Sequence, residues 1–378
     1  MNTRLLTISY TPHCLKEGRP AGWTATVREI DQLAGIFEQI VHIAPFYDQG
    51  SPGSADFYKA KNVVYKPVKP AGGKKLIDKI GIFLRIPEYI SIIFKELKNC
   101  DVVHVRCPSS ISLIALFMLM FLKFPQKRWI KYAGDWSGGQ KEAVSYSLQR
   151  WILKNNFTRA LVTINGEWPN QPKHISSFLN PCISEIELAQ ANLAGIRKIF
   201  FTPVRLLFVG RIETEKGIGT ALQILARLRD KHTDSFLDIV GDGPECAFFK
   251  KQAQDLNFKN IFFHGWLLRE DLNTLYNQAH FLILPSLAGE GWPKVLSEAM
   301  AFGALPLASP AGSIPQYLKK FAVGKILPVN DVDPWCQAIM DYMKNPEIFE
   351  SERGRAMKAA KNFTYEIYLR KIRVMLSI

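Results

Sequence analysis

Three features that the sequence lacks narrow the classes of protein to consider. The six cysteines lie singly, without a C-x-x-C pair, which argues against a zinc site or a disulfide framework and fits a reducing compartment. The most apolar segment, Ile111 to Phe124, spans about 14 residues, short of the roughly 20 that a transmembrane helix needs, and predicts a buried core helix. The start, MNTRLLTISYTP, lacks the apolar core and cleavage site of a signal peptide and predicts a first strand. We therefore expect a cytoplasmic protein.

The chain also lacks low-complexity tracts and repeats of fixed period. Its 378 residues exceed the size at which one hydrophobic core keeps growing, which predicts two domains. Lys and Arg outnumber Asp and Glu by 48 to 34, so the formal charge is +14. Such a surface attracts phosphates, nucleic acid or an acidic membrane face, and the charge alone does not choose among them.

Strand-like runs alternate with helical stretches in two successive halves. The first half contains LLTISY, a helical stretch from Thr24 to Phe37, QIVHIAP and DVVHVR, and the pattern restarts after Phe201 with RLLFVG, FLDIVG, IFFHG and FLILPS. Apolar strands separated by helices predict two doubly wound, Rossmann-like parallel sheets of the α/β class. We place the first domain at 1–195 and the second at 205–360, with a closing helix at 362–378 that packs back on the first domain. Ligands of such sheets bind at the carboxyl ends of the strands.

The loop after RLLFVG carries two cations. Arg211 and Lys216 precede Gly217 and a helix running to Asp230. A helix N-terminus attracts anions, and the added guanidinium and ammonium groups match a diphosphate. The alternative is a solvated turn.

Two carboxylates follow FLILPS. Glu290 and Glu298 are separated by seven residues in GEGWPKVLSEAM, and a helix beginning near Pro293 brings both within reach of one elongated ligand. Carboxylates accept hydrogen bonds from vicinal hydroxyls, so the pair suits a sugar and a ribose, whereas a metal site would need further ligands at short spacing. The alternative is a helix cap at Glu290 and a surface Glu298.

The second half resembles the donor domain of glycosyltransferase family 4, the retaining GT-B enzymes of glycosyl transferases group 1. The resemblance rests on GRIETEKG, VGDGPE, FHGWL and the E-x7-E segment GEGWPKVLSEAMAFGALPLAS, in that order. It implies a GT-B fold, with two Rossmann-like domains facing a central cleft. It also implies that Arg211 and Lys216 neutralise the leaving diphosphate, Glu290 contacts the transferred sugar and Glu298 holds the ribose. The further donor-binding residues that we expect are Gly22, Trp23, Gly210, Gly243, Gly265, Trp266, Gly291, Val295 and Leu296.

One position departs from that family's pattern. Pro293 stands where many members carry glycine, and proline has no backbone N–H to offer a ligand. Val295 and Leu296 are expected to supply backbone N–H groups at the helix start. The departure leaves the identity of the donor sugar open.

The first half offers weaker candidates. Gly18 and Gly22, in GRPAGWTATV, predict a loop between the first strand and a helix that can approach a phosphate; an ordinary connection is equally consistent. The segment resembles the family's glycine-containing first loop, which implies that Gly22 and Trp23 lean over the donor. In DVVHVRCPSS, the position of the family's catalytic histidine matches Arg106, with His104 two residues earlier on the same strand face. Both remain candidates for the reacting sugar, Arg106 also for an anionic group, and the alternative for His104 is a core residue.

Two further segments have both a functional and a structural interpretation. In KYAGDWSGG, Asp135 and Trp136 suit an acceptor site, with helix capping by Asp135 as the alternative. The D-x-D string of Asp331 and Asp333 would suit a metal-dependent enzyme, yet Pro334 follows, and this favours Asp333 as a helix N-cap. We therefore predict no metal site.

The stretch from Lys74 to Arg85 predicts an apolar helical stripe with flanking lysines, which suits core packing or peripheral contact with an anionic membrane. Taken together, the sequence predicts a metal-independent retaining hexosyltransferase, cytoplasmic or at the inner face of the membrane, acting in polysaccharide or glycoconjugate synthesis. It uses a UDP-, GDP- or ADP-sugar as substrate, no cofactor, a glycan, lipid-linked or small-molecule acceptor, and no nucleic acid. The alternatives are a GT-B-fold sugar-nucleotide epimerase and a non-catalytic protein that binds phosphate or membrane.

Overall fold

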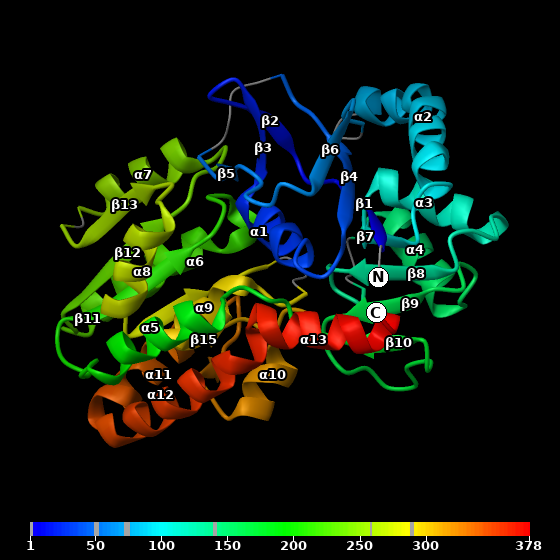
Figure 1. The fold of residues 1–378 in the computed structure, drawn as a ribbon. Helices are drawn as coiled ribbons and strands as arrows, with labels where there is room; N and C mark the ends of the chain where they lie inside the picture. The colour runs from blue at the N-terminus through cyan, green and yellow to red at the C-terminus, as the bar shows by residue number, and fades with distance from the viewer. Residues whose placement is uncertain (1–2, 49–52, 72–75, 139–141, 258, 288–290) are drawn as a thin grey trace. The chain divides into compact units, whose positions relative to one another are not determined.

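The computed structural model describes residues 3–48, 53–71, 76–138, 142–257, 259–287 and 291–378. The chain divides into two compact units (Figure 1). Unit 1 comprises Met1–Leu179 and Ile367–Ile378, and unit 2 comprises Asn180–Glu366. Each unit is built on one parallel sheet whose strands are connected through helices, so the expected α/β, doubly wound fold class is confirmed.

The sheet of unit 1 has seven parallel strands in the order β10-β9-β8-β7-β1-β4-β6. The chain starts near the middle with β1 and adds strands first on one side and then on the other. The strands are β1 (Arg4–Ile8), β4 (Gln39–Pro45), β6 (Val63–Val68), β7 (Val102–Cys107), β8 (Lys127–Tyr132), β9 (Leu161–Ile164) and β10 (Ile175–Ser177).

Helices cover both faces of this sheet, because neighbouring residues of each strand point to opposite sides. Leu5 packs with α1 (Thr24–Leu33) and α13 (Tyr365–Leu376), whereas Leu6 packs with α2 (Leu76–Leu97), α3 (Ser110–Phe121) and α4 (Val144–Lys154) (Figure 1). The helix at the end of the chain therefore contributes to the core of unit 1.

A small antiparallel sheet follows β1. It is formed by β2 (His13–Lys16), β3 (Arg19–Trp23) and β5 (Ala55–Asp56). Glu17 and Gly18, both with positive φ, make the turn between β2 and β3. The expectation of a glycine-containing loop here was wrong, since cross-strand pairing turns the segment into a hairpin.

The sheet of unit 2 has six parallel strands in the order β13-β12-β11-β14-β15-β16. In chain order this is 3-2-1-4-5-6, the strand order of dinucleotide-binding sheets. The strands are β11 (Val204–Val209), β12 (Ser235–Val240), β13 (Ile261–Gly265), β14 (Phe281–Leu284), β15 (Leu305–Ala308) and β16 (Lys325–Ile326). The strands β14 and β15 are buried throughout, as expected for a parallel sheet covered by helices.

Helices alternate with these strands. The 3-10 turn η1 (Thr214–Lys216) precedes α6, and η2 (Lys361–Phe363) follows α12. The helices of unit 2 are α5 (Glu185–Ile196), α6 (Ile218–Asp230), α7 (Cys246–Asp255), α8 (Arg269–Gln278), α9 (Lys294–Ala301), α10 (Ile314–Phe321), α11 (Asp333–Lys344) and α12 (Pro346–Ala360).

The D-x-D string lies at the start of α11. The residue before the helix is Val332, and the Asp331 carboxylate accepts a hydrogen bond from the backbone N–H of Asp333 at 3.0 Å. Asp333 itself pairs with Arg227 at 2.7 Å and with Lys231 at 3.6 Å. The predicted N-cap role of Asp333 was therefore wrong by one residue: Val332 is the N-cap, and the Asp331 carboxylate accepts from the first N–H of the helix.

Among the residues described, no helix combines the length and apolar character needed to cross a bilayer. The predicted helix at Ile111 is confirmed as α3, although its last turn is not buried: Phe121 is 80% exposed. In the stretch proposed for membrane contact, Lys74 and Lys75 lie outside the described residues, and the helix α2 begins at Leu76.

Candidate functional site

The sheet of unit 2 has its topological switch point between β11 and β14, which are neighbours although β12 and β13 intervene in the chain. Ligands of doubly wound sheets bind beyond the carboxyl ends of the strands at such a point. The loops that follow β11 and β14 are residues 210–217 and 285–293. Their described parts contain four of the donor-side residues predicted from the sequence, namely Gly210, Arg211, Lys216 and Gly291.

Glycines allow these loops to pack backbone against backbone. Gly217 has φ +80°, and a Cβ placed there would lie 1.9 Å from the carbonyl oxygen of Pro285. A Cβ on Gly241 would lie 1.9 Å from the carbonyl oxygen of Gly210, and one on Gly243 would lie 2.4 Å from that of Ile212. Side chains are therefore excluded at all three positions, and the ends of β11, β12 and β14 form one compact edge.

Further hydrogen bonds attach η1 to both neighbouring loops. The carbonyl oxygen of Glu215 accepts from the backbone N–H of Leu287 at 2.9 Å. The Glu245 carboxylate accepts from the backbone N–H and the hydroxyl of Thr214, at 2.6 and 2.8 Å. The short turn that carries the predicted cations is thus fixed from two sides.

The two predicted cations flank this turn. Arg211 follows β11 directly, its side chain is 67% exposed, and its guanidinium lies 3.4 Å from the Glu213 carboxylate. Lys216 is the last residue of η1, is partly buried, and immediately precedes Gly217, the N-cap of α6. Both cations therefore lie on one loop, at the N-terminus of a 13-residue helix.

The loop leading into α9 is anchored by its aromatic residue. Glu290 lies outside the described residues. The carbonyl oxygen of Gly291 accepts from the hydroxyl and the backbone N–H of Ser313, at 2.5 and 3.2 Å. Trp292 is 3% exposed, donates through Nε1 to the Ser297 hydroxyl at 2.7 Å, and stacks on Phe363 at a ring distance of 5.2 Å. Trp292 is a structural anchor of this loop.

The start of α9 offers fewer free N–H groups than expected. Pro293 is the N-cap, and the backbone N–H of Leu296 donates to its carbonyl oxygen at 3.2 Å. Val295 lies one residue closer to the loop. The predicted donation from Leu296 to a ligand therefore competes with a bond inside the turn.

Glu298 lies at the centre of a polar network inside unit 2. Its carboxylate accepts from the Arg269 guanidinium at 3.0 Å and from the Tyr276 hydroxyl at 2.9 Å, and its side chain is 12% exposed. Arg269 also donates to the Glu187 carboxylate at 3.1 Å and to the Cys182 carbonyl at 3.3 Å. A carboxylate has about four acceptor positions, so Glu298 keeps the capacity to accept from ligand hydroxyls.

Opposing influences act on the pKa values of this network. Burial alone would lower the pKa of Arg269, but the adjacent Glu298 and Glu187 carboxylates outweigh it and raise that pKa above its ordinary value. Burial, with the Glu298 charge, raises the pKa of Tyr276 well above its ordinary value. Tyr276 is therefore a neutral donor and Arg269 is a fixed cation, and both orient the Glu298 carboxylate through their hydrogen bonds.

At the end of β13, Gly265 has φ +66° and its carbonyl oxygen accepts from the backbone N–H of Gly241 at 2.8 Å. The following Trp266 is 45% exposed. The other tryptophan predicted to contact the donor, Trp23 of unit 1, is 49% exposed at the N-cap of α1. Both indole rings are accessible within their own units.

In unit 1 the candidate His104 is buried. It is 0% exposed on β7 and stacks on Trp129 at a ring distance of 3.6 Å. Within the part of the chain that the structure describes, neither ring nitrogen has a hydrogen-bond partner. Burial, together with the Arg106 charge, lowers the pKa of His104 well below its ordinary value. The core alternative describes His104 better, because its ring does not reach the surface of unit 1.

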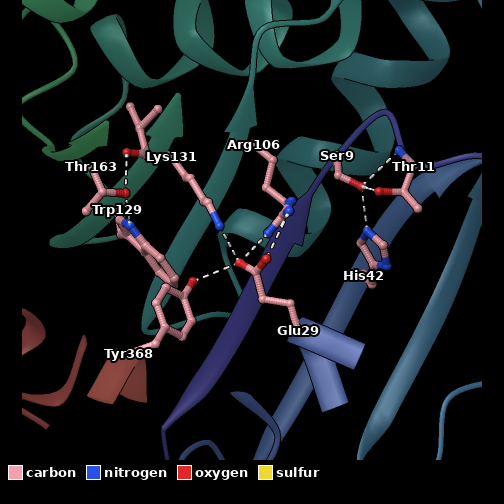
Figure 2. Close-up of polar contacts among 10 residues, drawn as sticks. Ser9, Thr11, Glu29, His42, Arg106, Trp129, Lys131, Thr163 and Tyr368 are labelled. Carbon is pink, nitrogen blue, oxygen red and sulfur yellow. Dashed lines mark hydrogen bonds and ion pairs between the residues drawn. The ribbon is translucent and has the colours of Figure 1, made fainter. Parts of the chain in front are cut away.

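Arg106 binds a carboxylate within its own unit. Its guanidinium donates to both oxygens of Glu29, at 2.8 and 3.3 Å, and Glu29 is 0% exposed. The same carboxylate accepts from Lys131 at 2.7 Å and from the Tyr368 hydroxyl at 2.9 Å (Figure 2). We name Glu29, Arg106, Lys131 and Tyr368 the Glu29 cluster. It joins α1, β7, β8 and α13, and it occupies the guanidinium that was expected to bind a ligand.

Gly22 is also used internally. It pairs with His13 across the β2–β3 hairpin, and a Cβ on Gly22 would lie 2.4 Å from the His13 ring. The absence of a side chain at Gly22 is therefore explained by the buried histidine, without reference to a phosphate.

The candidate acceptor residues occupy a turn. The Asp135 carboxylate accepts from the backbone N–H and the hydroxyl of Ser137, at 2.9 and 2.7 Å, whereas α4 begins only at Val144, so Asp135 does not cap it. Trp136 is 4% exposed and packs edge-on against Tyr132. The expectation that Trp136 stacks on a sugar was wrong for this conformation, because its ring belongs to the core.

A neutral chain of hydrogen bonds fills the carboxyl end of β1. His13 bonds through Nδ1 to the carbonyl of Thr11 at 2.9 Å, so Nδ1 carries the proton and Nε2 accepts from the Tyr58 hydroxyl at 2.8 Å. Tyr58 also bonds to Nδ1 of His42 at 2.5 Å, and Nε2 of His42 bonds to the Ser9 hydroxyl at 2.7 Å. The Ser9 hydroxyl itself donates to the Thr11 hydroxyl at 2.9 Å (Figure 2). Burial lowers the pKa of His13 to about 4 and that of His42 well below its ordinary value.

The sequence did not reveal Arg269, Tyr276 or the partners of Arg106 in the Glu29 cluster, which are Glu29, Lys131 and Tyr368. Arg269 and Tyr276 are seven residues apart, which places them on one face of α8 two turns apart, and this spacing was a usable signal. Glu29 is a charged residue within the apolar stripe of α1, which indicates a buried partner. The identity of those partners depends on contacts between segments distant in the chain.

Comparison with known proteins places a family match inside unit 2. Residues 195–363 match the model described as Glycosyl transferases group 1. Over 230 residues the chain is 25% identical to glycogen synthase of Mycobacterium tuberculosis, an alignment covering 59% of this chain and 54% of that protein. The chain thus spans about half the length of the curated relative that it matches.

Solved structures extend the likeness to both units. Sucrose-phosphate synthase from Thermosynechococcus elongatus superposes with a TM-score of 0.72 at 16% identity, covering 98% of this chain and 97% of that one. HepE of Anabaena, solved in complex with UDP-glucose, superposes with a TM-score of 0.69 at 14% identity, covering 99% of both chains. These likenesses establish that the fold is GT-B, with two Rossmann-like domains.

Proposed function

We propose that this chain is a retaining glycosyltransferase that moves a hexose-type sugar from a nucleotide-sugar donor to a glycan, lipid-linked or small-molecule acceptor. The main support is the arrangement at the edge of the unit 2 sheet, where the loop with Arg211 and Lys216 packs through Gly217 against Pro285 at the switch point. The family match to the same unit supports a transferase, and the binding of UDP-glucose by HepE supports a nucleotide-sugar as ligand. In this proposal the products belong to cell-surface polysaccharide or glycoconjugate synthesis.

The leaving diphosphate becomes more negative as its bond to the sugar breaks. Arg211, Lys216 and the N-terminal N–H groups of α6 supply positive charge at that position. One preorganised donor of this kind contributes roughly 3 kcal/mol of transition-state stabilisation. Two cations on one fixed loop therefore replace the charge that a metal ion provides in other transferases.

Glu298 is assigned to the ribose hydroxyls and Glu290 to the transferred sugar. Arg269 and Tyr276 support this role, because they orient the Glu298 carboxylate while leaving acceptor capacity. Glu290 is not assigned as a covalent nucleophile: the acceptor attacks the face from which the diphosphate leaves, and a phosphate oxygen takes the acceptor's proton. His104, Arg106 and Trp136 take no direct part, since each is buried or paired within unit 1.

A ligand screen tests the proposal. A donor that binds the folded state raises the melting temperature, so UDP-, GDP- and ADP-sugars are compared by thermal shift. We expect one nucleotide class to stabilise the wild type, and Lys216→Ala to lose that shift. Lys344→Ala, an exposed lysine of α11, is the matched control and should retain it.

Two outcomes would contradict the assignment. Equal shifts in wild type and Lys216→Ala would separate nucleotide binding from the proposed clamp. Conversion of the donor in the absence of any acceptor, followed by chromatography of the sugar nucleotide, would indicate an epimerase instead.

A further inference from the structure

One surface of unit 1 exposes large apolar side chains beside lysines and arginines. We name this surface the aromatic–basic face. It is formed by Phe117, Phe121, Lys123, Lys127, Trp151, Lys154, Phe157 and Arg159. Its aromatic residues are 41% (Phe117), 80% (Phe121), 53% (Trp151) and 39% (Phe157) exposed.

One buried arginine connects the ends of the two helices that carry this face. Arg128 donates to the carbonyl oxygens of Leu119 and Leu122, at the end of α3, and to that of Thr158, beyond α4, at 2.6, 2.7 and 2.9 Å. Trp151 and Phe157 lie edge to face with ring centroids 5.0 Å apart. The ends of α3 and α4 therefore form one fixed surface.

The charge on this face has one sign. Residues 121–128 and 151–161 contain Lys123, Lys127, Arg128, Lys154 and Arg159, and no Asp or Glu. Burial, and then the charge of Arg159, lowers the pKa of Arg128. Both stretches therefore attract an anionic partner.

A pocket of about 280 Å³ opens between these stretches and the end of α13. Its walls include the basic residues Lys127, Arg159 and His174 and the apolar residues Met375 and Leu376. Lys127 is oriented by donating to the carbonyl oxygen of Ser377 at 3.1 Å. Polar and apolar walls side by side suit an amphiphile with a phosphate group.

A second exposed apolar surface lacks this charge. On α5, Ile186 and Leu193 are 74% and 66% exposed, but Glu185 and Glu187 lie on the same helix. Exposed apolar area alone therefore does not distinguish the two surfaces. The uniform positive charge does.

We propose that the aromatic–basic face docks on an anionic phospholipid bilayer, with its aromatic rings at the interface and a lipid phosphate in the pocket. Phe117 and Phe121 lie one turn apart on α3, an apolar helix, so they enter the interface together. Lys and Arg near an anionic leaflet each strengthen binding about fivefold, and their apolar stems lie along the hydrocarbon boundary. This inference goes beyond the proposed function, because donor binding by unit 2 does not require it.

Vesicle flotation tests the proposal with the full chain. Phosphatidylcholine vesicles are compared with vesicles that also contain phosphatidylglycerol, at low and at physiological salt. We expect binding only to the anionic vesicles, weakening as salt rises. The double variant Lys123→Gln/Arg159→Gln should bind about 25-fold less, and Phe121→Ser about tenfold less.

Matched controls make each outcome decisive. Ile186→Ser/Leu193→Ser removes two exposed apolar side chains from a helix that also carries glutamates, and should bind like the wild type. Thermal melting confirms that every variant is folded, and the donor-induced shift, measured without lipid, tests unit 2 separately. Absence of wild-type binding to anionic vesicles, an equal loss in the α5 control, or tighter binding to a fluorescent oligonucleotide than to vesicles would overturn the proposal.

Discussion

Each unit has an arginine near the switch point of its sheet, but the two arginines differ in burial and pairing. In unit 1 the switch point lies between β1 and β7, and Arg106 near the end of β7 is paired with the buried Glu29. In unit 2 it lies between β11 and β14, and Arg211 beyond the end of β11 is 67% exposed. The same sheet order therefore supplies a structural ion pair in one unit and an accessible charge in the other.

The difference follows from the acidic partner. Glu29 lies on the buried face of α1, where it also collects Lys131 and Tyr368, so its cluster is closed to solvent. Glu213, beside Arg211, lies on a loop and leaves the guanidinium exposed. A cation near a strand end thus indicates a ligand site only when no helix opposite it carries a buried carboxylate.

The largest effect is expected for Glu29→Gln. It leaves Arg106 and Lys131 buried without their anion, and removal of one partner from a buried pair costs about 3–5 kcal/mol. Denaturant unfolding measures the loss. Asp333→Asn breaks an exposed pair with Arg227 in unit 2 and should leave the unfolding free energy unchanged; similar losses in both variants would remove the contrast between the units.

Lys216→Ala should weaken donor binding and turnover without affecting the stability of the fold. We expect turnover to fall about 100-fold to 1,000-fold, since one preorganised donor to the leaving group is lost, with an unchanged melting temperature. Steady-state kinetics with the donor found in the thermal screen measures this. A lowered melting temperature with normal turnover would make Lys216 a structural residue like Arg106.

Acid should destabilise unit 1 through its histidine chain. The folded pKa of His13 is about 4, below the ordinary 6.5, so the unfolded chain binds more protons between these values and the unfolding free energy falls as pH drops through that window. The loss reaches about 3 kcal/mol near pH 4, and His42, facing Tyr58 in the same chain, acts in the same direction. His13→Gln should flatten the pH dependence, and an unaltered slope would contradict this account.

The smallest effect is expected for Arg269→Met. The variant loses the bond that orients Glu298, so the KM for the donor should rise about tenfold while kcat changes little, equivalent to about 1.4 kcal/mol of binding. Glu187→Gln keeps the bond between Arg269 and Glu298 and serves as the control. An equal rise in KM for both variants would show that Arg269 acts by holding the fold.

The sequence contained enough information for the sheets and too little for the partners of their polar residues. The apolar runs of β11 and β14 and the helix α6 were predicted near their observed limits, because local apolar pattern and a preceding glycine determine them. The β2–β3 hairpin was missed, since Gly18 and Gly22 look alike in a loop and in a paired strand. Arg106 and Arg211 both lie near the end of a buried parallel strand, so the local sequence does not distinguish their roles. Only Glu29, 77 residues before Arg106, shows that Arg106 is a paired structural residue.

The bond from Tyr368 to Glu29 also sets an order of events during synthesis. These residues are 339 positions apart, so at about 5–20 residues per second the ribosome needs roughly 17–68 s between them. During that interval the first helix has emerged, while the hydroxyl that completes its charged cluster has not been made. Unit 1, although it begins the chain, can reach its final form only after translation of unit 2 has ended.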